Sequence, residues 1–128
     1  MTITSLRGRR ILLVEDELLI AMLIEASLED EGCVVVGPFG RLSDAMTAAE
    51  SEALDGALMD VNLAGERIFP AAERLSARRV PFVLLSGYGD KARPEGRAHW
   101  HFESKPFEIG HVMAVLDGMI QAAEAKRA

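Results

Sequence analysis

Short apolar runs alternate with longer stretches of helical periodicity along this chain. The runs are "RILLVED" from Arg10, "CVVVG" from Cys33, "GALMD" from Gly56, "VPFVLLS" from Val80 and the weaker "HWHFES" from His99. Nearly continuous apolar strands are typical of a parallel sheet whose two faces are both covered, whereas strands with one wet face alternate apolar and polar residues. The runs therefore predict five parallel strands in an α/β domain.

The segments between these runs predict the helices that cover the sheet. The first helical pattern follows Asp16 and ends at Gly32, because glycine commonly closes helices. One of its faces carries apolar residues at regular spacing, namely Leu19, Met22, Leu23 and Ala26.

Three further helices are expected. An alanine-rich stretch covers about 42–51, and another helix runs from near Pro70, which fits a first turn, to about Ala77. The last helix begins at Phe107 and is amphipathic, with one apolar face made of Ile109, Val112, Leu116 and Met119.

The crossover between the fourth and fifth strands departs from this pattern. Its sequence "GYGDKARPEGRA", residues 87–98, contains Gly87, Gly89, Pro94 and Gly96, and its only large apolar side chain is Tyr88. Proline in a helix interior costs roughly 3 kcal/mol and glycine about 1 kcal/mol. Because no apolar stripe is present to offset these costs, the fourth helix is predicted to be very short, distorted or mobile.

Composition limits the class of protein. The chain has 128 residues and a net charge of −6, which predicts one domain (core about 10–121) and argues against a nucleic-acid partner. Residues 1–9 are expected to be a polar lead-in, and the end from 123 is expected to fray. The apolar runs are too short for a membrane span, no secretion leader opens the chain, and the single Cys33 excludes an internal disulfide. We therefore expect a cytoplasmic protein with no membrane partner, with Cys33 buried and the methionines, Met22 and Met113 included, filling the core.

Polar residues stand at the ends of the predicted strands. In open α/β sheets, ligands bind beyond the carboxyl ends of the strands, and this chain brings to that edge Glu15, Asp16, Asp60, Ser86 and Lys105. Three close carboxylates repel one another unless a cation neutralises them, and a few hard oxygen ligands favour Mg²⁺. A lysine and a hydroxyl beside that ion suit a phosphoryl group, so Asp60 is predicted to be the nucleophile of a phosphoryl transfer.

The motifs "LLVEDE", "ALMDVNL", "LLSGYG" and "SKPF" follow one another in this order. With them the chain resembles the response-regulator receiver domain of two-component signalling, over about residues 10–121. The resemblance implies a flavodoxin-like (βα)5 three-layer sandwich with a parallel sheet of order 2-1-3-4-5. The stretches "DVNLAGE" and "VPFVLLSGYG" are most similar to receivers found alone or fused to sensor kinases in alphaproteobacteria.

The resemblance also implies a role for each site residue. Asp60 would accept a phosphoryl group from a histidine kinase, and Glu15, Asp16, Asp60 and the backbone carbonyl of Asn62 would bind Mg²⁺. The remaining roles would be those of the switch residues Ser86 and Phe102, the phosphoryl-binding Lys105, the tuning positions Asn62 and Tyr88, and a cis bond before Pro106. Such a protein is a phosphoacceptor with self-catalysed transfer and autodephosphorylation. It would signal to a downstream protein through the face of the fourth helix, fifth strand and fifth helix.

Other hypotheses are open from the residues alone. A small Mg²⁺-dependent phosphohydrolase would share the aspartyl-phosphate chemistry, but the haloacid-dehalogenase type needs a second acid where Asn62 stands. A receiver-like module that only binds partners would not need the complete set of acids, hydroxyl and lysine. A flavin-binding module would need a phosphate-cradling loop after the first strand. Taken singly, Phe102 is typical of a core aromatic, and His99 and His101 are typical of surface histidines.

Overall fold

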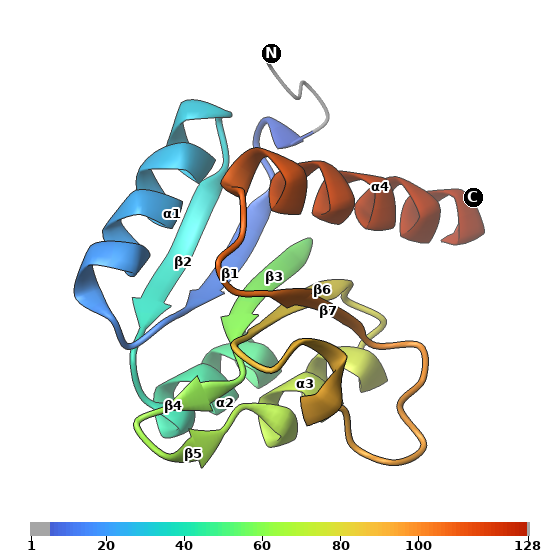
Figure 1. Ribbon diagram of the computed structural model, residues 1–128. Coiled ribbons are helices and arrows are strands. Elements are labelled where there is room, and N and C mark those ends of the chain that lie inside the picture. The colour runs from blue at the N-terminus through green and yellow to red at the C-terminus, as the bar shows by residue number, and fades with distance from the viewer. Residues whose placement is uncertain (1–5, 128) are drawn as a thin grey trace.

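The central sheet of the computed structural model, which describes residues 6–127, has five parallel strands (Figure 1). In chain order they are β1 (Arg10–Val14), β2 (Val34–Phe39), β3 (Gly56–Asp60), β6 (Phe82–Ser86) and β7 (His101–Ser104). Their spatial order is β2-β1-β3-β6-β7, and each neighbouring pair is parallel. The implied order 2-1-3-4-5 is thereby confirmed.

Helices cover both faces of the sheet (Figure 1). α1 (Leu18–Asp30) and α4 (Ile109–Arg127) share one core with the sheet, whereas α2 (Leu42–Ser51) and α3 (Phe69–Ala77) share the other. Successive residues of a strand point to opposite faces, so Ile11 of β1 belongs to the first core and Leu12 to the second. In the described residues, no helix is both long enough and apolar enough to cross a membrane.

The face of α1 that packs on the sheet is not the apolar face that the sequence indicated. Ala21, Ile24 and Leu28 are buried, while four large apolar residues are 54–79% exposed: Leu18, Leu19, Met22 and Leu23. The segment is apolar on more than one side, so its periodicity does not determine which side is buried. The expectation that Met22 fills the core is therefore wrong, although Met113 is indeed buried.

β2 extends further than the sequence predicted. Instead of closing at Gly37-Pro38, the strand passes through a cis peptide bond between these two residues and ends at Phe39. Its register against β1 shifts at that point, and pairing resumes where the Glu15 amide donates to the Phe39 carbonyl at 2.9 Å. The extra residues of β2 matter for the site because the hydrogen bond to the Phe39 carbonyl holds the backbone of Glu15 in place.

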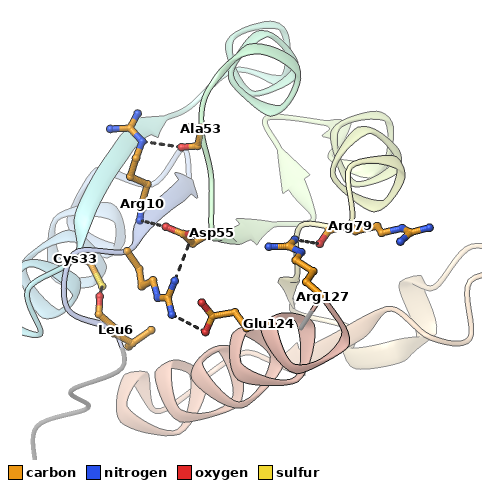
Figure 2. Close-up of polar contacts among 9 residues, drawn as sticks. Leu6, Arg10, Cys33, Ala53, Asp55, Arg79, Glu124 and Arg127 are labelled. Carbon is orange, nitrogen blue, oxygen red and sulfur yellow. Dashed lines mark hydrogen bonds and ion pairs between the residues drawn. The ribbon is translucent and has the colours of Figure 1, made fainter.

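Both ends of the described chain are more ordered than the composition suggested. Leu6 is fully buried, and its carbonyl accepts a contact from the Cys33 thiol at 3.5 Å (Figure 2). Residues 1–5 of the predicted polar lead-in lie outside the described residues. α4 begins at Ile109 rather than 107 and stays helical to Arg127, whose guanidinium donates to the Arg79 carbonyl at 3.1 Å (Figure 2). The predicted fraying from 123 is wrong over the described part of this helix.

Between β6 and β7 the chain forms only a short 3₁₀ helix, η2 (Gly89–Ala92), as the sequence predicted for the fourth helix. The half-buried Arg93 organises the rest of this crossover, because its guanidinium donates to the carbonyls of Arg97 at 2.9 Å, Ala98 at 3.2 Å and Trp100. The same guanidinium lies 4.7 Å from the ring centre of Phe102. One side chain thus satisfies backbone groups that a helix would have paired internally.

A small antiparallel hairpin follows β3 directly, and the sequence patterns did not predict it. Its strands are β4 (Asn62–Leu63) and β5 (Glu66–Arg67), joined by Ala64 and Gly65. Both linking residues have positive φ, 50° and 94°, as a tight two-residue hairpin turn requires. The hairpin places its own residues beside the carboxyl end of β3.

Candidate functional site

The five predicted polar residues meet at the carboxyl edge of the sheet. Glu15 and Asp16 follow β1, Asp60 closes β3, Ser86 closes β6 and Lys105 follows β7. Parallel register brings these ends together, since Asp60 pairs with Leu85, the residue before Ser86. A cleft of about 620 Å³ opens here. Its walls include Asp16, Asp60, Ser86 and Lys105.

The acids form a compact cluster. Glu15, Asp16 and Asp60 each offer a carboxylate oxygen, and these three oxygens lie within 4.8 Å of one another. Glu15 and Asp60 are buried, whereas Asp16 is exposed on the open side. Burial raises the pKa of Glu15 from 4.5 to about 7, and the nearby charge of Asp60 adds to the rise.

Lys105 supplies the positive charge on the other side of Asp60. Its Nζ lies 3.2 Å from Asp60 Oδ1 and 3.6 Å from Glu15 Oε1. Partial burial lowers the pKa of the Lys105 ammonium, but the carboxylates of Asp60 and Glu15 outweigh that effect and leave the pKa above its usual value. The lysine therefore stays charged and partly neutralises the cluster.

A divalent cation fits this donor set. Glu15 Oε1 is buried and has no hydrogen-bond partner among the described residues, while its other oxygen accepts from the Glu17 amide at 3.1 Å. At 3.6 Å the lysine is too distant to donate a hydrogen bond to Oε1. A buried oxygen without a donor beside two further carboxylates matches the oxygen-rich ligation of Mg²⁺.

The hairpin holds the open side of the cluster. The Ala64 amide donates to Asp16 Oδ2 at 3.0 Å, and the Asn62 side-chain oxygen accepts from the Gly65 amide at 2.9 Å. The Asn62 side chain is thus engaged in the turn, while the backbone amide of Asn62 donates to Asp60 Oδ1 at 3.4 Å. The hairpin also brings Arg67 to the cleft wall, a residue that the sequence patterns did not single out because no strand was predicted there.

Of the remaining predicted residues, Ser86 and Tyr88 line the cleft and Phe102 does not. Ser86 is buried, and its hydroxyl accepts from the Tyr88 amide at 3.0 Å. Tyr88 also lines the cleft and is 73% exposed. The peptide bond before Pro106 is cis. Phe102 does not line this cleft; it lies on β7 under the guanidinium of Arg93 and lines a neighbouring depression with η2.

The sequence profile of the response regulator receiver domain matches residues 11–117. The chain belongs to this family. Receiver domains are typically phosphoacceptors rather than enzymes in the usual sense, and the acidic cluster of this receiver is consistent with their Mg²⁺ site.

Relatives of known structure share this fold. The receiver domain of sensor histidine kinase PA1611 from Pseudomonas aeruginosa PAO1, with a magnesium ion coordinated in its active-site cleft, is 29% identical with a TM-score of 0.76. That comparison covers 89% of this receiver and 98% of the other chain. SdrG from Sphingomonas melonis Fr1 is 34% identical with a TM-score of 0.73, covering 93% and 99% of the two chains.

A curated relative is longer. The transcriptional regulatory protein PdtaR of Mycobacterium tuberculosis is 30% identical over 115 residues, which are 85% of this receiver. The match spans only 55% of the length of PdtaR. This chain therefore spans about half the length of that regulator.

Proposed function

We propose that this receiver takes a phosphoryl group from a histidine kinase onto Asp60 and signals by a change of conformation. One observation carries the proposal: the carboxylate of Asp60 lies 3.2 Å from the Lys105 ammonium, within a cluster whose buried Glu15 oxygen has no donor. The Asp60 carboxylate thus lies between the positive charge of Lys105 and the acids that can bind a metal ion. Phosphoryl transfer needs positive charge on both sides of the reacting group.

The proposed step is an in-line displacement at phosphorus. A carboxylate oxygen of Asp60 forms the new O–P bond as the N–P bond of a phosphohistidine breaks, and the electron pair of that bond remains on the imidazole nitrogen. Bound Mg²⁺ would supply charge neutralisation, held by Glu15, Asp16, Asp60 and the backbone carbonyl of Asn62. Lys105 holds a phosphoryl oxygen, and the Ser86 hydroxyl exchanges its contact with the Tyr88 amide for one with the phosphoryl group.

The alternative of a phosphohydrolase has less support from the site. An enzyme of that type would need an acid two residues after Asp60, where Asn62 stands with its side-chain oxygen engaged by the Gly65 amide. Asn62 and Tyr88, both on the cleft wall, would instead tune the lifetime of the phosphorylated form. We propose that residues 1–128 act as one receiver domain with its core at about 10–121, in the cytoplasm.

The exposed apolar face of α1 supports a protein as the phosphodonor. Glu17, which precedes the first turn of α1, lines the cleft, and Leu18 and Leu19 follow it at 70% and 79% exposure. A donor that brings its phosphohistidine to Asp60 must cover this rim. The output is proposed to use the surface formed by η2, β7 and α4, outside the cleft, where Phe102 would respond to phosphorylation.

Intact mass measurement tests the proposal. The protein is incubated with Mg²⁺ and a small phosphodonor such as acetyl phosphate, which needs no docking surface. The wild type and the control Asp44→Asn, an exposed acid on α2, should each gain one phosphoryl group, and Asp60→Asn should gain none. Equal incorporation by Asp60→Asn would refute the assignment of the acceptor.

A further inference from the structure

A second cation reaches the cleft besides Lys105. Arg67, on β5 of the hairpin, lines the same cleft as Asp60, Ser86 and Lys105. It stands seven positions after Asp60 in the sequence, and none of the motifs that indicated the site includes it.

A fixed frame carries Arg67 to that position. It pairs with Asn62 across the hairpin, and the Asn62 side chain closes the turn through the Gly65 amide at 2.9 Å. The Ala64 amide then joins the hairpin to Asp16 at 3.0 Å. The backbone of Arg67 is therefore connected to the acid cluster through main-chain pairing and two short hydrogen bonds.

The charges in the cleft leave this guanidinium available. Lys105 is already engaged by the carboxylates of Asp60 and Glu15. Among the described residues, the Arg67 side chain has no hydrogen bond or ion pair, although Asp16, Glu17 and Asp60 line the same cleft. A guanidinium presents planar paired donors that match two oxygens of a phosphoryl group, which an ammonium cannot do.

We propose that Arg67 is an anion-binding residue of this cleft that contacts the phosphoryl group carried by Asp60. The inference rests on the proposed phosphoryl transfer and adds to it a second cationic contact, from the hairpin side. In this role Arg67 stabilises the phosphorylated form and provides no ligand to the metal ion. As a cation beside three acids, it disfavours Mg²⁺ slightly until the anion arrives.

Two titrations separate an anion contact from a merely structural role. The first measures Mg²⁺ alone by calorimetry, and the second measures beryllofluoride, a phosphoryl mimic, at saturating Mg²⁺. Arg67→Ala should weaken beryllofluoride binding about tenfold, the value of one charge-assisted contact of about 1.4 kcal/mol, and leave Mg²⁺ binding equal or slightly tighter. Arg67→Lys should recover part of the loss.

Matched controls complete the test. Lys91→Ala removes an exposed positive charge from η2, outside the cleft, and Glu66→Ala changes the neighbouring residue of β5. Both should bind beryllofluoride as the wild type does. Unchanged beryllofluoride affinity in Arg67→Ala would overturn the inference, and so would an equal loss of Mg²⁺ affinity, because that result indicates a damaged hairpin. Failure of the wild type to bind beryllofluoride would instead refute the proposed phosphoryl transfer itself.

Discussion

At the level of single residues, Lys105 and Asp16 act in opposite directions on the same acid cluster. The Lys105 ammonium lies 3.2 Å from Asp60 and neutralises part of the charge that attracts a cation. Asp16 adds an exposed carboxylate to the cluster, held by the Ala64 amide at 3.0 Å. A lysine ammonium carries a positive charge and N–H donors but no lone pair. It can therefore contribute to anion binding and cannot ligate a metal ion.

Replacing Lys105 with alanine should therefore tighten Mg²⁺ binding by roughly three- to tenfold, because a competing cation leaves the cluster. Asp16→Ala should weaken it by at least about tenfold, since a ligand and its charge are lost. Calorimetric titration at low ionic strength measures both, with Lys91→Ala as the exposed-lysine control. Weaker Mg²⁺ binding by Lys105→Ala would contradict the role given to this lysine. Despite its tighter Mg²⁺ binding, Lys105→Ala should show less than the full wild-type conformational response to beryllofluoride.

At the level of elements, the strands could be predicted from sequence because continuous apolar runs have few interpretations. The meeting of the acids, Ser86 and Lys105 could be predicted as well, because the carboxyl ends of parallel strands lie at one edge of the sheet. The hairpin could not be predicted, because its turn depends on Ala64 adopting a positive φ that alanine rarely takes. Consequently Arg67 was missed. The buried face of α1 was equally undetermined, since both Leu23 and Ile24 lie in helical register with other apolar residues.

The irregular crossover depends on Arg93. Its guanidinium donates to backbone carbonyls that hydrogen bonds within a regular helix would otherwise satisfy. Arg93→Met keeps much of the side chain's volume but removes its donors to three carbonyls. We expect a loss of roughly 1–3 kcal/mol in unfolding free energy and faster hydrogen exchange over 90–98. Trp100, the single tryptophan, lies in this region, so its fluorescence reports the change directly. Lys91→Met is the control. If exchange over 90–98 in Arg93→Met were as slow as in α4 of the wild type, a stable helix would form there and the prediction would be wrong.

The junction of β7 and α4 contains a carboxylate between two imidazoles. Glu103 Oε2 lies 2.5 Å from His101 Nε2, and its Oε1 lies 3.2 Å from Nε2 of His111 in α4. The hydrogen bond from His101 lowers the pKa of Glu103 below its ordinary value of 4.5; partial burial opposes this, and the charges of His101 and His111 add to it. A lowered carboxyl pKa means that the folded state binds fewer protons than the unfolded state.

Glu103 should therefore stabilise the fold above pH 4.5, and this stabilisation should disappear as the pH falls through and below that value. Chemical unfolding of wild type and Glu103→Gln between about pH 6 and about pH 3 measures the difference. We expect a difference of up to about 1 kcal/mol at the upper end, since the groups are near the surface, shrinking toward zero at the lower end. Glu108→Gln, an exposed acid nearby, should show no such trend. A difference that grows with acidity would contradict the assignment.

At the scale of the whole molecule, the two ends of the sheet have different functions. At the amino ends of the strands, polar contacts join distant segments, as where Arg10 donates to Asp55 at 2.8 Å and to the Ala53 carbonyl at 2.7 Å (Figure 2). At the carboxyl ends, the acids, the hairpin and the segment Ser86 to Tyr88 that precedes η2 surround an open cleft. The first end stabilises the fold, and the second carries the cleft that Asp60 lines, beside the exposed face of α1.

That geometry gives a test that separates docking from chemistry. Leu19→Glu combined with Leu23→Glu places charges on the exposed face of α1 and leaves the buried Ala21, Ile24 and Leu28 untouched. Phosphorylation by acetyl phosphate should proceed at the wild-type rate, because a small donor needs only the cleft. Transfer from a phosphorylated histidine kinase should slow by about tenfold or more, since burying two charges against an apolar partner surface is costly. Val34→Glu, an exposed apolar position on β2, is the matched control and should affect neither rate. An equal loss with both donors would place these leucines in the chemistry of Asp60 rather than in recognition, and unchanged transfer from the kinase would remove α1 from the docking surface.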